Sequence, residues 1–165
     1  MDLNIVFQGQ RGNVIYLDGQ DVTGLIRQPD VTANVSTVST HKKVRDFIVA
    51  LQDQIGRQGS VVMDGRDIGT VVMPDADWKI FLQATVEERA RRRQQELQRK
   101  GVVVDIKDLQ EQIRTRDHLD STRENSPLRK AEDAIEIDTT SLSISEVVEK
   151  VLDLIQGEAE TCTRS

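Results

Sequence analysis

The stretch SVVMDGRDIGTVVMPDADWKIFL at residues 60–82 decides the fold, because a polar turn and a proline separate two short apolar runs. Both runs, 60–63 and 79–82, have the length and the β-branched or bulky side chains that are typical of buried strands. The polar sequence DGRD at 64–67 follows the first run directly. In sheets of parallel strands, ligands bind beyond the carboxyl ends of the strands, so this turn is a candidate site.

Helices are predicted on both sides of this stretch. Upstream, apolar residues at positions 44, 48, 51 and 55 repeat at the spacing of one face of an amphipathic helix, and Gly56 and Gly59 follow it. Downstream, Thr85 and Glu88 have the spacing of a capping box. The helix that this box opens can run to Gly101, since glycine is a common helix stop.

The rest of the chain adds two helical segments and a third buried strand. A helical pattern begins at Ile106 and leads toward Pro127, and the segment AIEI at 134–137 is typical of a strand. A second capping box at 143–146 opens a last helix. We expect Gly157 to stop that helix and residues 158–165 to form a loose tail.

The chain opens with two alternating segments, 3–8 and 13–17, around a glycine-containing turn at 9–12. This pattern predicts an antiparallel hairpin. Short strands that then alternate with longer helices predict an α/β fold with a parallel sheet flanked by helices.

Composition narrows the class of protein further. Of 165 residues, 37% are hydrophobic and 30% charged, which is typical of a globular chain. A net charge of −6 argues against a general nucleic-acid surface, because phosphate backbones bind to positive faces. The single cysteine, Cys162, fits a reducing compartment, and neither a membrane-spanning run nor a signal-peptide pattern occurs. We therefore expect a cytoplasmic protein without a membrane partner.

Three charged residues that follow the helical pattern beginning at Ile106 form one candidate site. Arg116, Asp120 and Arg123 are spaced by four and three residues, which places them on one helical face if the helix extends that far. Such a stripe can be a solvated ladder of ion pairs. It can also hold a nucleotide, because guanidinium groups match phosphate oxygens and a carboxylate accepts hydrogen bonds from ribose hydroxyls.

The DGRD turn is the second candidate site. Asp64, Arg66 and Asp67 form either an ordinary polar turn or a cluster that binds a phosphate, a base edge or a metal-bound water. Neither cluster alone separates these alternatives.

Together with their flanks, the two clusters resemble bacterial cytidylate kinases. The matching segments cover residues 1–156 in order: GQDVTGLIR at 19–27, the pair Val44-Arg45, DGRDIGTVVMPDADWKIFL at 64–82, EERARRRQQELQRKG at 87–101 and RDHLDSTRENSPLRKAEDAIEIDTTSLSISEVV at 116–148. The resemblance implies a P-loop NTPase-like parallel sheet with a small antiparallel β-plus-helix insert. It places the insert and its following helix at 1–57 and the rest of the core at 58–157, with a lid at about 91–116.

The resemblance also implies roles for individual residues. Ser36, Arg45 and Asp67 match positions that recognise the cytosine edge, and Asp120 matches a position on the ribose. Arg66, Arg116 and Arg123 match arginines around the sugar and phosphates, and Arg92 and Arg93 match lid residues near the donor nucleotide. The expected substrate site is thus Ser36, Arg45, Asp64, Arg66, Asp67, Arg116, Asp120 and Arg123, and the expected catalytic set is Arg66, Arg92, Arg93, Arg116 and Arg123, with no protein metal ligand.

The reaction implied by the resemblance is phosphoryl transfer from ATP to CMP or dCMP, giving CDP or dCDP and ADP, with Mg²⁺ accompanying ATP. Kinases of this type use a phosphate-binding loop, G-x-x-x-x-G-K-[ST], which does not occur in these 165 residues. We therefore expect the first strand and the P-loop to lie outside this chain and its activity alone to be impaired.

Two further functions remain open at this stage. One is a non-catalytic module that binds CMP, and the other is an assembly-prone fragment. The family resemblance implies a monomer, but an open sheet edge predicts self-association.

Overall fold

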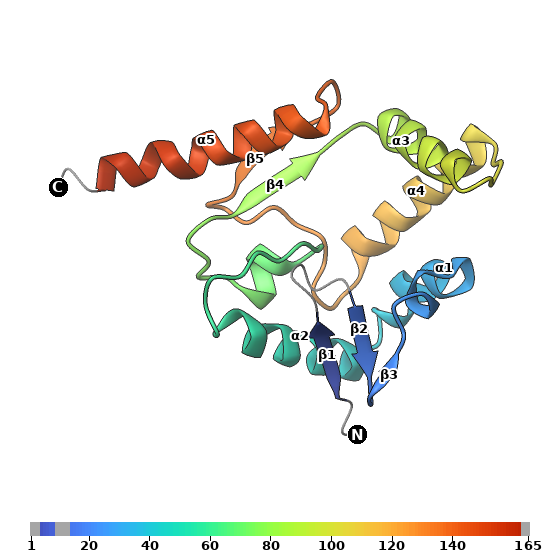
Figure 1. Ribbon diagram of the computed structural model, residues 1–165, viewed down its shortest axis with the longest axis horizontal. Helices are drawn as coiled ribbons and strands as arrows, with labels where there is room; N and C mark the ends of the chain where they lie inside the picture. The colour runs from blue at the N-terminus through green and yellow to red at the C-terminus, as the bar shows by residue number, and fades with distance from the viewer. Residues whose placement is uncertain (1–3, 9–13, 163–165) are drawn as a thin grey trace.

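The computed structural model describes residues 4–8 and 14–162. Figure 1 shows a mixed α/β chain in which β1–β3, α1 and α2 lie on one side and β4, β5, α3 and α5 on the other, with α4 reaching between them. The elements are β1 (Ile5–Gln8), β2 (Val14–Leu17), β3 (Gln20–Asp21), a 3₁₀ turn η1 (Leu25–Arg27), α1 (Pro29–Val38), α2 (Lys42–Gly56), a π-helical turn η2 (Ile68–Val72), β4 (Ile80–Gln83), α3 (Val86–Arg99), α4 (Ile106–Thr122), β5 (Ile135–Asp138) and α5 (Ile144–Cys162).

The first sheet is antiparallel and has the strand order β1-β2-β3. Ile5 pairs with Leu17 and Gln8 with Val14, so the predicted hairpin is confirmed. Its predicted turn at 9–12 lies outside the described residues. This sheet and the helices that follow it form the small antiparallel β-plus-helix part of the expected fold.

The second sheet is a parallel pair of β4 and β5, in which Ile80 pairs with Ile135 and Gln83 with Asp138. Both strands begin one residue later than the sequence pattern predicts. Because parallel strands need a long crossover, α3 and α4 together form the connection between them. Among the residues that the structure describes, neither strand has a second neighbour.

The predicted strand at 60–63 is wrong. Residues 61–64 have no regular secondary structure, Ser60 has a left-handed φ of 51°, and the side chain of Val62 is 99% exposed. A strand needs a hydrogen-bonded neighbour, and no strand in the described part of the chain pairs with this segment. The apolar run is therefore unpaired.

The helix boundaries follow from their caps. Thr85 Oγ1 accepts a hydrogen bond from the Glu88 backbone N–H at 3.3 Å, as the capping box predicts. At the other end of α3, Gly101 has a φ of 76°, a left-handed conformation that glycine adopts without steric cost. The helix therefore stops where the sequence indicates.

The predicted stop at Gly157 is wrong, because α5 continues to Cys162. Glycine in a helix interior costs only about 1 kcal/mol relative to alanine, and Glu158, Ala159 and Glu160 after it are good helix formers. Residues 158–162 are therefore helical rather than loose. The remainder of the predicted tail lies outside the described residues.

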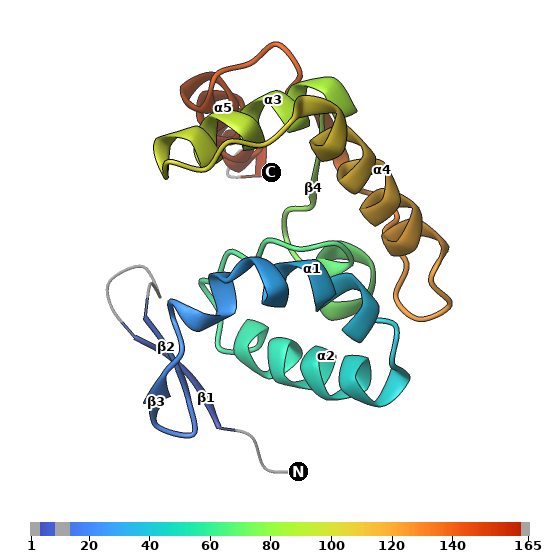
Figure 2. The same ribbon diagram turned by 90° about the vertical axis from the view of Figure 1, so that its right-hand side faces the viewer.

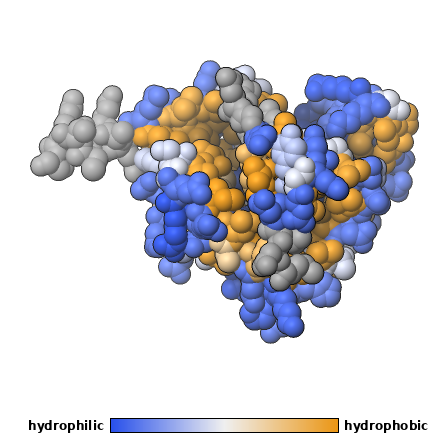
Figure 3. Space-filling view, turned by 60° about the horizontal axis from the view of Figure 1, so that its bottom comes forward, coloured by the Kyte–Doolittle hydropathy of each residue, from blue (hydrophilic) through white to orange (hydrophobic). Residues whose placement is uncertain are grey.

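Fully buried apolar side chains are few among the described residues: Val72, Ala90, Leu109 and Ile137. Ala90 and Leu109 lie on α3 and α4, which pack against each other. Larger apolar residues such as Val103 and Ile144 are exposed. Figure 3 shows hydrophobic side chains gathered across the middle of one face, with hydrophilic residues around them.

Candidate functional site

A cavity of about 160 Å³ lies where α1, α2, the 65–68 turn and the C-terminal end of α4 come together. Figure 2 shows α1 above α2, with α4 descending toward them. The cavity therefore joins residues that are distant in the sequence. Its lining is Val35, Ser36, Ser39, Arg45, Gln52, Gly65, Arg66, Asp67, Ile68, Arg116, Asp120 and Arg123.

Two buried aspartates form the floor of this site. The side chains of Asp67 and Asp120 are each only 3% exposed. Arg45 on α2 donates a hydrogen bond from Nη2 to Asp67 Oδ2. The guanidinium of Arg123 lies 3.9 Å from Oδ1 of each aspartate. Because isolated buried charges are costly, these ion pairs are what allows both carboxylates to remain in the interior.

Two more arginines surround Asp120. Arg66 Nε lies 3.3 Å and Arg116 Nε 3.7 Å from Asp120 Oδ2. Their side chains are 36% and 45% exposed, in contrast with that of Arg123, which is 4% exposed. Arg66 and Arg116 can therefore reach a ligand at the open side of the cavity while Arg123 stays in its wall.

Local backbone structure explains how these residues meet. Asp67 precedes the π-helical turn η2, and its carbonyl accepts a hydrogen bond from Val71 N–H at 2.9 Å. Asp120 lies in the last turn of α4, and its carbonyl accepts from Leu128 N–H at 2.7 Å. Arg123 caps the C-terminus of α4 and donates from Nε to the Ser126 carbonyl at 2.6 Å. The chain after α4 thus folds back and holds Arg123 against the site.

The cavity wall contains polar atoms that are buried and have no hydrogen-bond partner in the described structure. They are two donors, Arg45 Nε and Arg123 Nη2, and two acceptors, Gln52 Oε1 and Asp120 Oδ2. Buried polar groups are nearly always hydrogen-bonded, so a cluster of unsatisfied ones in a single cavity indicates a ligand with matching donors and acceptors.

The charge of the site indicates the chemistry of that ligand. Four arginines line the cavity against two aspartates, which leaves two positive charges uncompensated. A phosphate monoester carries about −1.5 to −2 charges at neutral pH, and one guanidinium group can donate two parallel hydrogen bonds to its oxygens. The site is therefore suited to a molecule that combines a phosphate with hydrogen-bonding edges.

Most of the predicted substrate residues meet in this cavity, but three of the predicted site residues do not line it. Asp64 is exposed and lies outside the lining. Arg93 is exposed on α3 and pairs with Glu96 at 2.6 Å. Arg92, also on α3, contacts the segment after β5. The predicted residues that do line the cavity are Ser36, Arg45, Arg66, Asp67, Arg116, Asp120 and Arg123.

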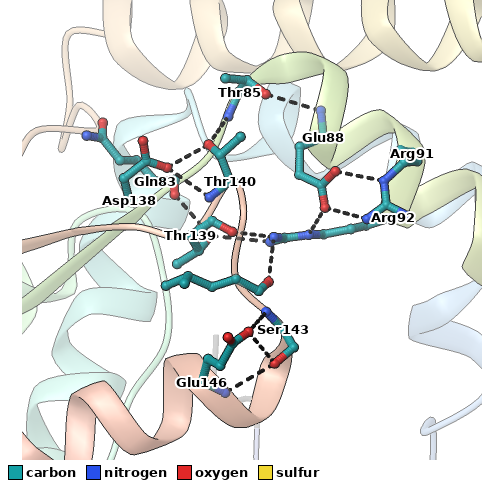
Figure 4. Close-up of polar contacts among 11 residues, drawn as sticks. Gln83, Thr85, Glu88, Arg91, Arg92, Asp138, Thr139, Thr140, Ser143 and Glu146 are labelled. Carbon is teal, nitrogen blue, oxygen red and sulfur yellow. Dashed lines mark hydrogen bonds and ion pairs between the residues drawn. The ribbon is translucent and has the colours of Figure 1, made fainter.

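Arg92 is held by several acceptors, as Figure 4 shows. Its Nε donates to Glu88 Oε1 at 2.8 Å, and its Nη2 donates to the carbonyls of Thr139 and, at 3.3 Å, Leu142. Thr139 is buried at the end of β5. In this conformation Arg92 ties α3 to the β5–α5 connection.

The carboxyl group in this cluster, that of Glu88, has a strongly lowered pKa. Arg91 donates two hydrogen bonds of 2.7 Å to Glu88, in addition to the one from Arg92. Hydrogen bonding from Arg91 is the main cause that lowers the pKa of Glu88 from 4.5 to about 2. Glu88 is therefore ionised at neutral pH and cannot supply a proton there.

Sequence reasoning did not identify Val35, Ser39, Gln52 or Ile68, although all four line the cavity. For Gln52 a signal exists, because it follows Arg45 by seven residues on α2, which is two helical turns on one face. For the others the sequence offers no signal beyond proximity to Ser36 and Asp67.

The cavity contains two carboxylates, those of Asp67 and Asp120. Both are engaged by arginines, and within the described ranges no group of three or more His, Cys, Asp or Glu side chains is placed to hold a metal ion. Nor does any helix of the described residues have the length and apolar character needed to cross a membrane.

Comparison with known proteins places this chain in a family. A family model described as cytidylate kinase matches residues 1–157. A cytidylate kinase of Bacillus cereus is 53% identical over 157 residues, which are 94% of this chain and 70% of that protein. A cytidylate kinase of Enterococcus faecalis is 56% identical over 149 residues, which are 90% of this chain and 66% of that protein.

The mixed α/β fold and the match to these enzymes identify the chain as a nucleoside monophosphate kinase, which is a type of transferase. Within that class, the chain belongs to the cytidylate kinase family. The resemblance noted from the sequence motifs is thus confirmed.

Proposed function

We propose that the cavity binds CMP or dCMP and that the function is phosphoryl transfer from ATP to this nucleotide, giving CDP or dCDP and ADP. The observation that carries the proposal is the cluster of unsatisfied buried donors and acceptors beside two buried aspartates. A nucleoside monophosphate offers acceptors on its base and phosphate, and donors on its amine and hydroxyls.

The base edge is assigned to Ser36, Arg45 and Asp67. A serine hydroxyl and an arginine donor complement the O2 and N3 acceptors of cytosine, and the carboxylate of Asp67 accepts from the exocyclic amine. Asp67 is held for this purpose by its ion pair with Arg45. A site built to pair such groups rejects a base that leaves them unpaired.

The sugar and phosphate are assigned to the other end of the cavity. Asp120 Oδ2 accepts from a ribose hydroxyl, and the partly exposed Arg66 and Arg116 bind the phosphate oxygens, with Arg123 neutralising charge from the wall. Asp64, which precedes the 65–68 turn, is exposed, and we assign it only to outer contacts with the nucleotide. Catalysis is then positioning and charge neutralisation, without a covalent intermediate.

The donor side of the reaction needs a change in α3. For Arg92 and Arg93 to reach the transferring phosphate, the contacts of Arg92 with Thr139 and of Arg93 with Glu96 must break. Mg²⁺ is proposed to arrive with the phosphates of ATP, since no group of acidic, histidine or cysteine side chains among the described residues is placed to hold a metal ion. We assign the activity to the cytoplasm, where ATP is the abundant phosphoryl donor.

A second candidate is a module that binds CMP without transferring phosphate. The observation that favours it is the engagement of Arg92 with the β5–α5 connection, away from the cavity. The open edges of the β4–β5 pair also support a proposal of self-association. Size-exclusion chromatography at two concentrations, with and without CMP, measures that property directly.

The test combines binding and turnover in one set of variants. CMP binding is measured by calorimetry and CDP formation by chromatography, for the wild type, Arg116→Ala and the matched control Arg114→Ala, which is exposed on the same helix. The kinase proposal expects CDP formation that falls at least tenfold in Arg116→Ala and is unchanged in Arg114→Ala. CMP binding without CDP formation selects the binding module, and no CMP binding contradicts both.

A further inference from the structure

Gln52 is a polar residue of the cavity that the proposed contacts with CMP do not use. It lies on α2, two turns after Arg45, and it lines the cavity. Its Oε1 atom is buried and accepts no hydrogen bond within the described residues. Burying an unsatisfied carbonyl oxygen is unfavourable, so this acceptor is suited to a donor that enters with a ligand.

The donors of the proposed ligand are few. A nucleoside monophosphate in its dianionic form has hydrogen-bond donors only on the ribose hydroxyls and, for cytosine, on the exocyclic amine. The hydroxyls are assigned to Asp120, which lies on α4. Gln52 shares α2 with Arg45, which is assigned to the base. Its position therefore matches the amine rather than the sugar.

The amine itself requires two acceptors. It carries two N–H bonds, and Asp67 can take one of them while its other interactions are with Arg45 and Arg123. The second N–H of a buried amine is left unsatisfied unless another acceptor is present. In the cavity wall the remaining unsatisfied acceptor, besides Asp120 Oδ2, is Gln52 Oε1.

We propose that Gln52 Oε1 accepts a hydrogen bond from the exocyclic amine of cytosine and that Gln52 is a specificity-determining residue of the site. This inference rests on the proposed function, since it assumes that the base of CMP occupies the α2 side of the cavity. Uracil carries a carbonyl oxygen in place of the amine, and two acceptor oxygens cannot share a hydrogen bond. Gln52 thus adds to the preference for cytosine over uracil.

The experiment removes each partner of this hydrogen bond separately. Calorimetry measures the affinity of the full chain for CMP and for its analogue with hydrogen in place of the amine. The wild type is compared with Gln52→Met, which keeps the length of the side chain but removes the acceptor. Gln54→Met is the matched control, because Gln54 is exposed on the same helix and lies outside the cavity. Circular dichroism monitors folding of each variant.

The expected result is an affinity about tenfold lower for the analogue than for CMP in the wild type and in Gln54→Met. In Gln52→Met this ratio falls to about twofold, because the acceptor is gone. Gln52→Glu still has an acceptor at this position, so it should keep the wild-type ratio of the two affinities. It tests the inference if Gln52→Met does not fold. The inference is overturned if the ratio is unchanged in Gln52→Met or falls to about twofold in Gln52→Glu. In either case, CMP binding by the wild type still supports the proposed function. A wild type that does not bind CMP overturns both.

Discussion

Arg45 and Asp67, which are 22 residues apart in the chain, form an ion pair inside the cavity, with side chains only 11% and 3% exposed. The pair joins α2 to the turn after residue 64, so it is a tertiary contact as well as part of the proposed base site. Burying it requires that both partners be present, because a single buried charge is strongly unfavourable.

The first prediction follows from this pair. Arg45→Met should lower the free energy of unfolding by about 3 kcal/mol, since it leaves the Asp67 carboxylate with only the more distant Arg123. The double variant Arg45→Met/Asp67→Asn should recover part of this loss. Urea denaturation measures these two variants and Asp67→Asn, and a double variant that loses as much stability as the two single variants together would contradict the pairing.

A second prediction concerns Asp120. Asp120→Asn removes the charge that Arg66, Arg116 and Arg123 surround, and it weakens the acceptor assigned to the ribose. We expect CMP affinity to fall about tenfold by calorimetry. Asp108→Asn, an exposed position in the first turn of α4, is the control and should leave affinity unchanged. Equal affinities for the two variants would remove Asp120 from the site.

A third prediction uses the pH dependence of stability. The pKa of Glu88 is lowered from 4.5 to about 2 in the folded chain, mainly by hydrogen bonding from Arg91. The folded state therefore favours the ionised carboxylate, and its contribution is fully present above pH 4.5 and is lost as the pH falls toward 2.

The measurement for this prediction compares the wild type with Glu88→Gln by urea denaturation across the acid range. The difference between their free energies of unfolding should be constant near neutral pH and should shrink below pH 4.5. Other acids titrate in both proteins, so the difference isolates Glu88. A difference that stays constant down to pH 2.5 would show that Glu88 has an ordinary pKa.

A fourth prediction separates the two adjacent arginines of α3. Arg92→Ala should lower the free energy of unfolding by about 2 kcal/mol, because it leaves the Thr139 and Leu142 carbonyls without the charged donor that now satisfies them. Arg93→Ala removes only an exposed pair with Glu96 and should cost less than about 0.5 kcal/mol. Thermal or urea denaturation compares them, and equal effects would mean that Arg92 does not tie α3 to the β5–α5 connection.

Local sequence signals predicted α2, α3 and α4 well, because each has an apolar stripe, and α3 and α4 also have side-chain N-caps. Thr85 and Glu88 adopt the predicted capping geometry, and α4 reaches Thr122, far enough to place Arg116 and Asp120 on one side. The local sequence pattern did not mark the first helix, α1, which only the family resemblance implied, although Pro29 at its start and Asp30 in its first turn are helix-start signals.

The failures have two causes, one in tertiary structure and one in local sequence. A strand at 60–63 depends on a neighbour that a short apolar run cannot specify, and the end of α5 depends on residues beyond a single glycine. In the site, the family motifs pointed to the charged residues, whereas the seven-residue spacing of Gln52 from Arg45 became informative only once α2 had been placed against the cavity.

The parallel pairing of β4 with β5 also has a consequence for the order of folding. Ile80 meets Ile135 only after the whole intervening chain has been brought back on itself, and closing so long a loop is entropically unfavourable. The contacts between α3 and α4 are nearer in sequence, and the salt bridge between Arg89 and Asp117 stabilises them. This helical hairpin can therefore form first. It then shortens the loop that must close before β5 pairs with β4.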